Sequence, residues 1–257
     1  MSTTYRLTDL ALPYLLDSTG ISFCAKGLYI LICHVQPESI AHLALVSGVS
    51  GPVVKRECKA LKEEGWLSFD ITKSQRTIIT PTAPDGVQQE LVKWLDGVRA
   101  TWFPAGENIM RSMLDNTVAV SGCLDNCRPT HIANPTSGYR LEFDRFYYSQ
   151  GVAFEFQGVQ HRTRTSLHKS DEEFEDAQTR DLVKIGLCVR HDIEVVEITE
   201  ADLRIDRIVT KIPDRLPLLR VDRASEYVRR LDRIGQEYMY WCKRNRGQNT
   251  KPGGGSA

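Results

Sequence analysis

The spacing of apolar residues in the first third of the chain predicts three helices. One is expected over 21–35, a short one over 39–46, and a third from Pro52 to Gly65. The turn before the third helix contains Gly48, which suits a backbone with positive φ. The apolar stripe of the first helix consists of Leu28, Leu31, Ile32 and Val35.

Two β-rich runs follow, at 66–72 and 76–80, and this order of helices and hairpin is typical of a winged helix-turn-helix. The stretch resembles the winged-helix domains of bacterial repressors and of phage or plasmid replication initiators. Its third helix would enter the major groove of DNA, although such domains also dock on proteins. The candidate DNA-binding residues are Ser50, Lys55, Arg56 and Lys59 on that helix, with Lys73 and Arg76 on the wing.

The next segment predicts a helix that connects two domains. Apolar residues recur at three- to four-residue spacing over 85–102, and Pro84 precedes them. We therefore expect a winged-helix domain at 1–84, a connecting helix at 85–103 and a second domain at 104–247, followed by a disordered tail at 248–257.

Two runs in the second domain, 139–148 and 152–161, are apolar enough to be buried strands, and a turn over 149–151 joins them. The polar exceptions include Asp144, Glu155 and Gln157. Burying a carboxylate costs several kcal/mol unless a cation or hydrogen bonds compensate, and two acids on adjacent strands repel each other. A hard divalent cation removes that repulsion, so the pattern predicts a magnesium site on a hairpin.

This pattern resembles the PD-(D/E)xK nuclease superfamily over residues 104–200. Asp144 and Glu155 match the two acids of the motif, and Gln157 stands where lysine is common. The string from Phe154 to His161 is similar to a bacterial and phage branch related to very-short-patch repair endonucleases. Further elements of that branch are matched by Gly106, Glu107, Arg128, Pro129, Gln178, Asp181 and Lys184.

The resemblance implies hydrolysis of DNA phosphodiester bonds with Mg²⁺, for which Mn²⁺ could substitute. Asp144 and Glu155 would hold the metal, and Gln157 would add an oxygen or position the water. Lys184 would replace the missing motif lysine, or else form a surface ion pair with Asp181 or another acid. Glu107 would join the acids, or only favour the dipole of a helix over 108–114. Possible supporting residues are Gln160, His161 and Asp181.

The remaining pattern completes a mixed α/β (α+β) domain with the order αβββαβ and a C-terminal helix. A helix is expected over 171–190 with Leu182, Ile185 and Val189 buried, and a strand over 193–198. A helix over 225–243 has an apolar stripe that ends at Trp241. From Arg204 to Lys251 there are 13 basic and 6 acidic residues, which favours either a phosphate-facing surface or a solvated helix.

Composition narrows the class of protein. The 257 residues are 41% hydrophobic and 26% charged with zero formal net charge, which is ordinary for a globular protein. No apolar run approaches the ~20 residues of a membrane span, and no signal core is present, so we expect a cytoplasmic protein without a membrane partner. The seven cysteines are scattered, and Cys123, Cys127 and His131 form an incomplete zinc set.

Together these patterns predict a metal-dependent, site-specific DNA endonuclease of mobile-element, phage or defence type. Double-stranded DNA would be its partner, and a homodimer is plausible because a double-strand cut usually needs two active sites. One alternative is a non-catalytic DNA-binding regulator with a degenerate nuclease fold. Another is a nuclease subunit that a transposase or replication-initiator partner recruits.

Overall fold

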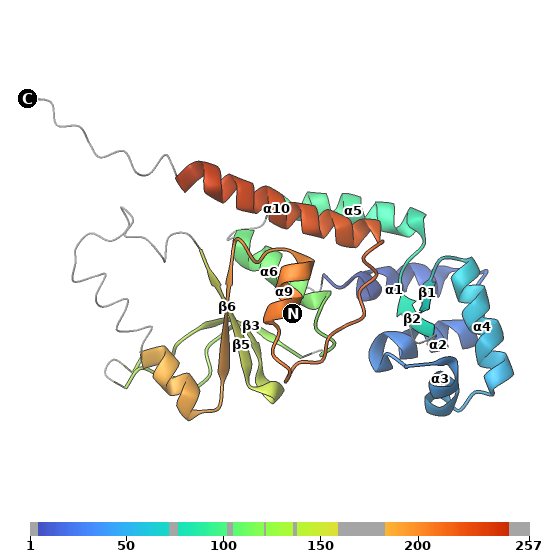
Figure 1. Cartoon of the computed structure of the whole chain (residues 1–257), viewed down its shortest axis with the longest axis horizontal. Coiled ribbons are helices and arrows are strands. Elements are labelled where there is room, and N and C mark those ends of the chain that lie inside the picture. The colour runs from blue at the N-terminus through green and yellow to red at the C-terminus, as the bar shows by residue number, and fades with distance from the viewer. Residues whose placement is uncertain are drawn as a thin grey trace, which may run out of the picture.

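The computed structural model describes residues 5–71, 77–101, 105–120, 122–135, 138–158 and 183–246. A helical module forms one end and a sheet with its covering helices forms the other, and two long helices lie side by side along one edge (Figure 1). The expectations for Lys73, Arg76, Gln160, His161 and Asp181 fall outside the described residues.

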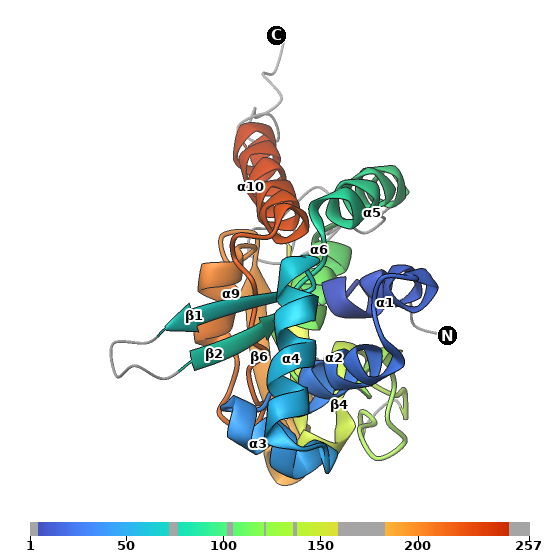
Figure 2. The ribbon, with the colours of Figure 1, turned by 90° about the vertical axis from the view of Figure 1, so that its right-hand side faces the viewer.

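The N-terminal module consists of four helices and a hairpin. Its elements are α1 (Leu7–Asp17), α2 (Phe23–Val35), α3 (Ile40–Ser47), α4 (Gly51–Glu63), β1 (Leu67–Ile71) and β2 (Thr77–Pro81). The two strands pair antiparallel, and α4 crosses the front of this end of the molecule while the hairpin projects to one side (Figure 2). Three helices and the hairpin match the predicted order, whereas α1 was not predicted.

Local chemistry explains where these helices begin and end. The Ser22 and Ser39 hydroxyls accept hydrogen bonds from backbone N–H groups in the first turns of α2 and α3, as N-cap residues do. Gly48 follows α3 with φ of 68°, so the prediction of a positive φ there is confirmed. Gly65 has φ of 78° just after α4, which allows the chain to leave the helix directly into β1.

The second half contains a mixed sheet of four strands in the order β3-β4-β5-β6. Only the β5–β6 pair is parallel. An unlabelled helix over 183–190 precedes β6. The elements are α5 (Asp85–Arg99), α6 (Ala105–Asp115), β3 (Leu124–Cys127), β4 (Phe143–Tyr147), β5 (Val152–Gln157), β6 (Glu194–Thr199), α9 (Ile205–Lys211) and α10 (Glu226–Arg246). The chain is therefore a mixed α and β protein with a small mixed sheet.

Several predicted boundaries and faces were wrong. Helix α6 begins at Ala105 rather than at Asn108, and Glu107 lies in its first turn, as one of the two interpretations of this residue expected. Ile185 and Val189 are 52% and 75% exposed, and the helix over 183–190 instead buries Cys188 against the sheet. Trp241 is 61% exposed although it continues the apolar stripe of α10.

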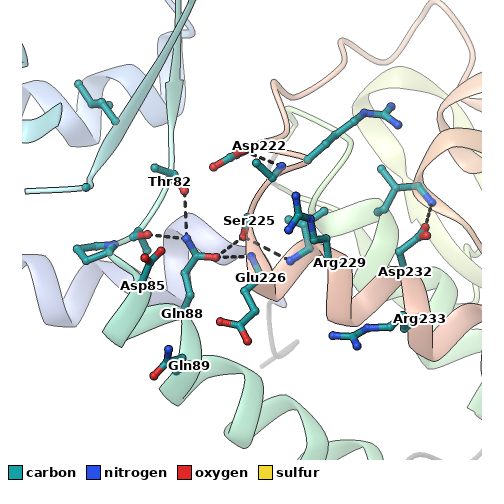
Figure 3. Close-up of a pocket in the computed structure, with 18 of the residues that line it drawn as sticks. Thr82, Asp85, Gln88, Gln89, Asp222, Ser225, Glu226, Arg229, Asp232 and Arg233 are labelled. Atoms are coloured by element: carbon teal, nitrogen blue, oxygen red, sulfur yellow. Dashed lines mark hydrogen bonds between the residues drawn. The ribbon is translucent and has the colours of Figure 1, made fainter.

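The two halves share contacts through the start of the chain and through the two long helices. The Arg6 guanidinium donates hydrogen bonds to the carbonyl oxygens of Asp115 (2.9 Å) and Val118 (2.8 Å). In Figure 3, Gln88 on α5 lies between the two parts; its amide nitrogen donates to the Ala83 carbonyl and its oxygen accepts from Ser225 and Glu226. These bonds close one end of a cleft of about 1230 Å³ between the N-terminal module and α10.

The length and hydropathy of a helix decide whether it can cross a membrane, and both are known for the part of the chain that the structure describes. No single helix there is both long and apolar enough to cross a bilayer. Helices α2 and α3 reach the length and composition only when taken together, and they are bent by 105° with respect to each other.

Candidate functional site

The two acids of the predicted hairpin lie next to each other on β4 and β5. The strands pair Arg145 with Phe154, so the next position of the same register places Asp144 beside Glu155 on one face. The Asp144 Oδ2 atom accepts a hydrogen bond from the Phe156 N–H at 2.6 Å. Asp144 is therefore held against the strand that carries Glu155 and, two residues further on the same face, Gln157.

Lys184 lies against these acids from the helix over 183–190. Its Nζ atom is 2.8 Å from the Glu155 Oε1 atom and also donates to the Glu142 carbonyl oxygen. It lies 4.8 Å from the centre of the Phe143 ring. Both members of the pair are mostly buried, with side-chain exposures of 18% and 17%, so this is no surface ion pair.

Glu107 reaches the same region from the first turn of α6. A Cβ atom on Gly106 would lie 2.1 Å from the Phe156 ring, so only glycine allows α6 to begin this close to the end of β5. One turn after Glu107, the Arg111 Nη2 atom lies 3.3 Å from the Glu107 carboxylate and donates to the Asp144 carbonyl oxygen at 3.0 Å. Arg111 was not predicted, although its four-residue spacing from Glu107 places both on one helix face.

The carboxyl groups of this region have raised pKa values. Burial raises the pKa of Glu155 to about 7, where Lys184 opposes the shift and Asp144 adds to it. Burial and then the charge of Asp144 raise the pKa of Glu107 to about 7. Burial also raises the pKa of Asp144, against its bond from Phe156 and the nearby cations Arg111 and Lys184. Burial is thus the main cause of all three raised pKa values, and repulsion by neighbouring acids is a smaller contribution.

This donor set fits a hard divalent cation in part. The ligands would be carboxylate oxygens with an amide oxygen from Gln157, which is what Mg²⁺ prefers, and Mg²⁺ often binds with one or two carboxylates plus waters. The Glu155 Oε1 atom is buried and accepts no hydrogen bond of good geometry. Among the described residues, however, no three His, Cys, Asp or Glu side chains converge into a group that could hold a metal by themselves.

On the opposite face of the sheet, Arg145 forms a second charged cluster that the sequence analysis missed. Its side chain is 1% exposed. The Nη1 atom donates to Asp115 Oδ1 at 2.6 Å and to the Arg111 carbonyl oxygen at 3.0 Å, and the Nε atom donates to Asp125 Oδ1 at 2.8 Å. Strand alternation could have indicated it, because a residue next to an inward-facing Asp144 must point to the other face.

Four candidate DNA-binding residues of the N-terminal module are described, and Ser50, Lys55, Arg56 and Lys59 are all exposed on α4 or at its start. Arg56 is bonded to its neighbour Glu57 at 2.9 Å, and Glu57 also accepts a hydrogen bond from Ser22. Lys59 lies 3.6 Å from Glu63. Lys55 has no ion pair within the described part of the chain, so it is the least restrained cation of this helix.

The cysteine expectation concerns Cys123 and Cys127, which are half-buried free thiols. Burial raises the pKa of both thiols. A raised pKa disfavours the thiolate form that binds zinc.

Comparisons with known proteins do not assign this chain to a family. No family model matches it, and no solved structure matches it. It is similar to uncharacterized protein 033L of Invertebrate iridescent virus 3, with 30% identity over 94 residues, which are 36% of this chain and 47% of the viral protein. The match thus spans about half the length of that relative.

Proposed function

We propose that the protein is a metal-dependent DNA endonuclease. The observation that carries the proposal is the cluster of Asp144, Glu155 and Lys184, in which two adjacent buried acids face one lysine from a neighbouring helix. Buried acids with raised pKa values are more frequent at functional sites than elsewhere, because their repulsion costs stability. A bound cation would relieve that repulsion.

The order of elements around the cluster supports the PD-(D/E)xK assignment. Helix α6, three strands, the helix over 183–190 and β6 follow one another in the order αβββαβ. The first acid is on the second strand and the next acid is on the third. The preceding helices and hairpin have the order of a winged helix-turn-helix, in which α4 would be the recognition helix.

In this proposal Asp144 and Glu155 would hold Mg²⁺ or Mn²⁺, with Gln157 as a further oxygen ligand. When bound, the metal would activate a water and neutralise charge on the phosphate. Lys184 would stabilise the negative charge that develops during phosphodiester cleavage, in place of the motif lysine. Arg111 would orient Glu107 toward Asp144 through its bonds to both residues.

A cleavage assay tests the proposal. Supercoiled plasmid and linear duplexes are incubated with the full chain and Mg²⁺ or Mn²⁺, and the ends are mapped. Asp144→Ala and Glu155→Ala should each lose nearly all cleavage while they retain part of the DNA affinity. Glu194→Ala is the matched control, because it removes an exposed strand acid from the far end of β6, beside Val152 rather than Glu155. Cleavage by both acid variants at the normal rate would refute the site.

The ion pair itself favours a second candidate, a DNA-binding regulator without activity. Lys184 offsets the charge of Glu155, so a lysine could stabilise this fold where related proteins need a metal. Titration calorimetry with Mn²⁺ separates the two functions. A regulator should bind DNA through α4 and lose affinity in Lys55→Ala, yet show neither saturable metal binding that depends on Asp144 nor any cleavage.

A further inference from the structure

Helix α10 has one exposed face with a row of cations, which begins one turn after the exposed acid Glu226. Over its 21 residues it presents Arg229, Arg233, Tyr240, Lys243 and Arg244 to solvent, and we call these five residues the basic ridge. At 3.6 residues per turn they lie within a sector of ~100° on the helix. None of the four cations forms an ion pair with any residue that the structure describes.

Two other arginines on or near α10 are paired with acids. Arg230, only 100° around the helix from Arg229, is bonded to Asp96 at 2.6 Å and to Glu237 at 2.9 Å. Glu237 also pairs with Arg99, so its charge is already balanced. The helix thus uses one arginine to attach itself to α5 and leaves the cations of the ridge available to a partner.

The ridge begins at the cleft between the two halves. At its start, Arg229 and Arg233 line the cleft (Figure 3). The cleft interior is of mixed charge, because Glu63, Glu64 and Asp85 line it as well. On the opposite side of α10, ~180° around the helix from Arg229, the Tyr238 ring packs on Phe156 with ring centres 6.1 Å apart, so that side faces the sheet and the ridge faces away from it.

We propose that the basic ridge binds the phosphate backbone of duplex DNA along the exposed face of α10, beginning at the cleft. From Arg229 to Arg244 the helix rises ~22 Å, which is the length of about six base pairs. Arginine and lysine at one- to two-turn spacing along such a length suit contact with successive phosphates. The inference extends the proposed function by naming the surface that the substrate follows.

Salt dependence of binding tests the ridge without any need for cleavage. Anisotropy of a fluorescent 30-base-pair duplex of arbitrary sequence is measured with the full chain in EDTA at several salt concentrations. In Arg229→Gln/Arg233→Gln/Lys243→Gln/Arg244→Gln the slope of log K against log salt should become shallower by ~3.6, since each lost phosphate contact removes ~0.9. The affinity near 0.1 M salt should fall at least tenfold.

The double variant Arg140→Gln/Arg190→Gln is the control, because it removes two exposed arginines away from the ridge. It should keep the wild-type slope. A thermal melt confirms that the quadruple variant is folded, as expected for substitutions at exposed positions. An unchanged slope in the folded quadruple variant overturns the ridge and leaves the hydrolytic proposal standing. A shallower slope in a chain that never cuts DNA supports the ridge and refutes hydrolysis.

Discussion

Two neighbouring residues of β4, Asp144 and Arg145, belong to charged clusters that differ in how their acids are paired. Arg145 points to the α6 side of the sheet, where Asp115 and Asp125 surround its guanidinium at 2.6 and 2.8 Å. Asp144 points to the other face, where Glu155 adds a second acid and Lys184 is bonded to Glu155 rather than to Asp144. In the first cluster both acids are hydrogen-bonded to one arginine, whereas in the second the lysine is paired with only one of the two acids among the described residues.

The pKa directions show the same contrast. Burial opposes the charged form of Arg145, but its two acids outweigh that effect and raise its pKa, so it remains charged. Burial raises the pKa of Asp115, while Arg145 and the Tyr5 N–H oppose that shift. Glu155 and Glu107 instead have pKa values of about 7, close to the point of protonation in neutral solution. Bonds from one cation to both acids favour stability, whereas acids with strongly raised pKa values are more frequent at functional sites.

The largest expected effect on stability comes from the cluster around Arg145. Arg145→Met leaves Asp115 and Asp125 without their cation in a buried place, which should lower the free energy of unfolding by about 3–5 kcal/mol. Urea denaturation at pH 7 measures the change. Lys211→Met is the control, because it removes a half-exposed partner of Asp202 and should cost about 1 kcal/mol or less. A similar loss in both variants would show that the buried Arg145 cluster costs no more to break than a half-exposed ion pair.

A smaller effect is expected when the one cation bonded to Glu155 is removed. Lys184→Met should lower the rate of DNA cleavage by about 10²-fold, or ~2.7 kcal/mol in the barrier, because developing charge on the phosphate loses its partner. Lys184→Arg should recover part of the rate. Single-turnover cleavage in saturating Mg²⁺ provides the measurement, and an equal rate in the methionine variant would limit Lys184 to a structural ion pair.

The smallest effect concerns the dependence of stability on pH. Folding raises the pKa of Glu107 from 4.5 to about 7, so the folded chain holds this proton more tightly than the unfolded chain does. Stability from this group is therefore full below pH 4.5 and declines as the pH rises to about 7. Glu107→Gln should be more stable than wild type at pH 8, by about 1 kcal/mol after allowance for solvent screening, and nearly equal to it at pH 4.

Chemical denaturation at the two pH values measures that difference. Glu90→Gln serves as the control, since Glu90 is an exposed acid on α5 that pairs only with Lys93 at the surface. Equal stability of wild type and Glu107→Gln at both pH values would mean that neither burial nor the negative charge of Asp144 raises the pKa of Glu107.

Much of the local structure was predictable because its determinants are local. The hydroxyls of Ser22 and Ser39, the positive φ of Gly48 and the apolar spacing of α2 act within a few residues of one another, so the pattern located these helices to within two residues. Helix α1 was missed, and its contact with the rest of the chain is made through residues far away in sequence, such as Asn116, which bonds the Leu7 N–H.

The residues of the candidate site also fall into two groups, those that the sequence could identify and those that it could not. Asp144 and Glu155 could be identified because a carboxylate inside an apolar strand is conspicuous in any sequence. Arg111 and Arg145 were missed, because an arginine acquires its role only when distant elements bring acids to it. The exposed face of the helix over 183–190 could not be predicted either, because it depends on which distant elements pack against that helix.

The sequence by itself determined most of the helices and strands, though not α1 or α9, together with the two acids on adjacent strands and the glycine that the turn before α4 requires. Those features follow from backbone preferences and from contacts a few residues apart. Only the tertiary structure decided that Lys184 pairs with Glu155, that Arg145 is neutralised on the opposite face, and that one side of α10 keeps its cations unpaired. Pairing of charges depends on distances between segments that are remote along the chain, and local preferences contain no information about those distances.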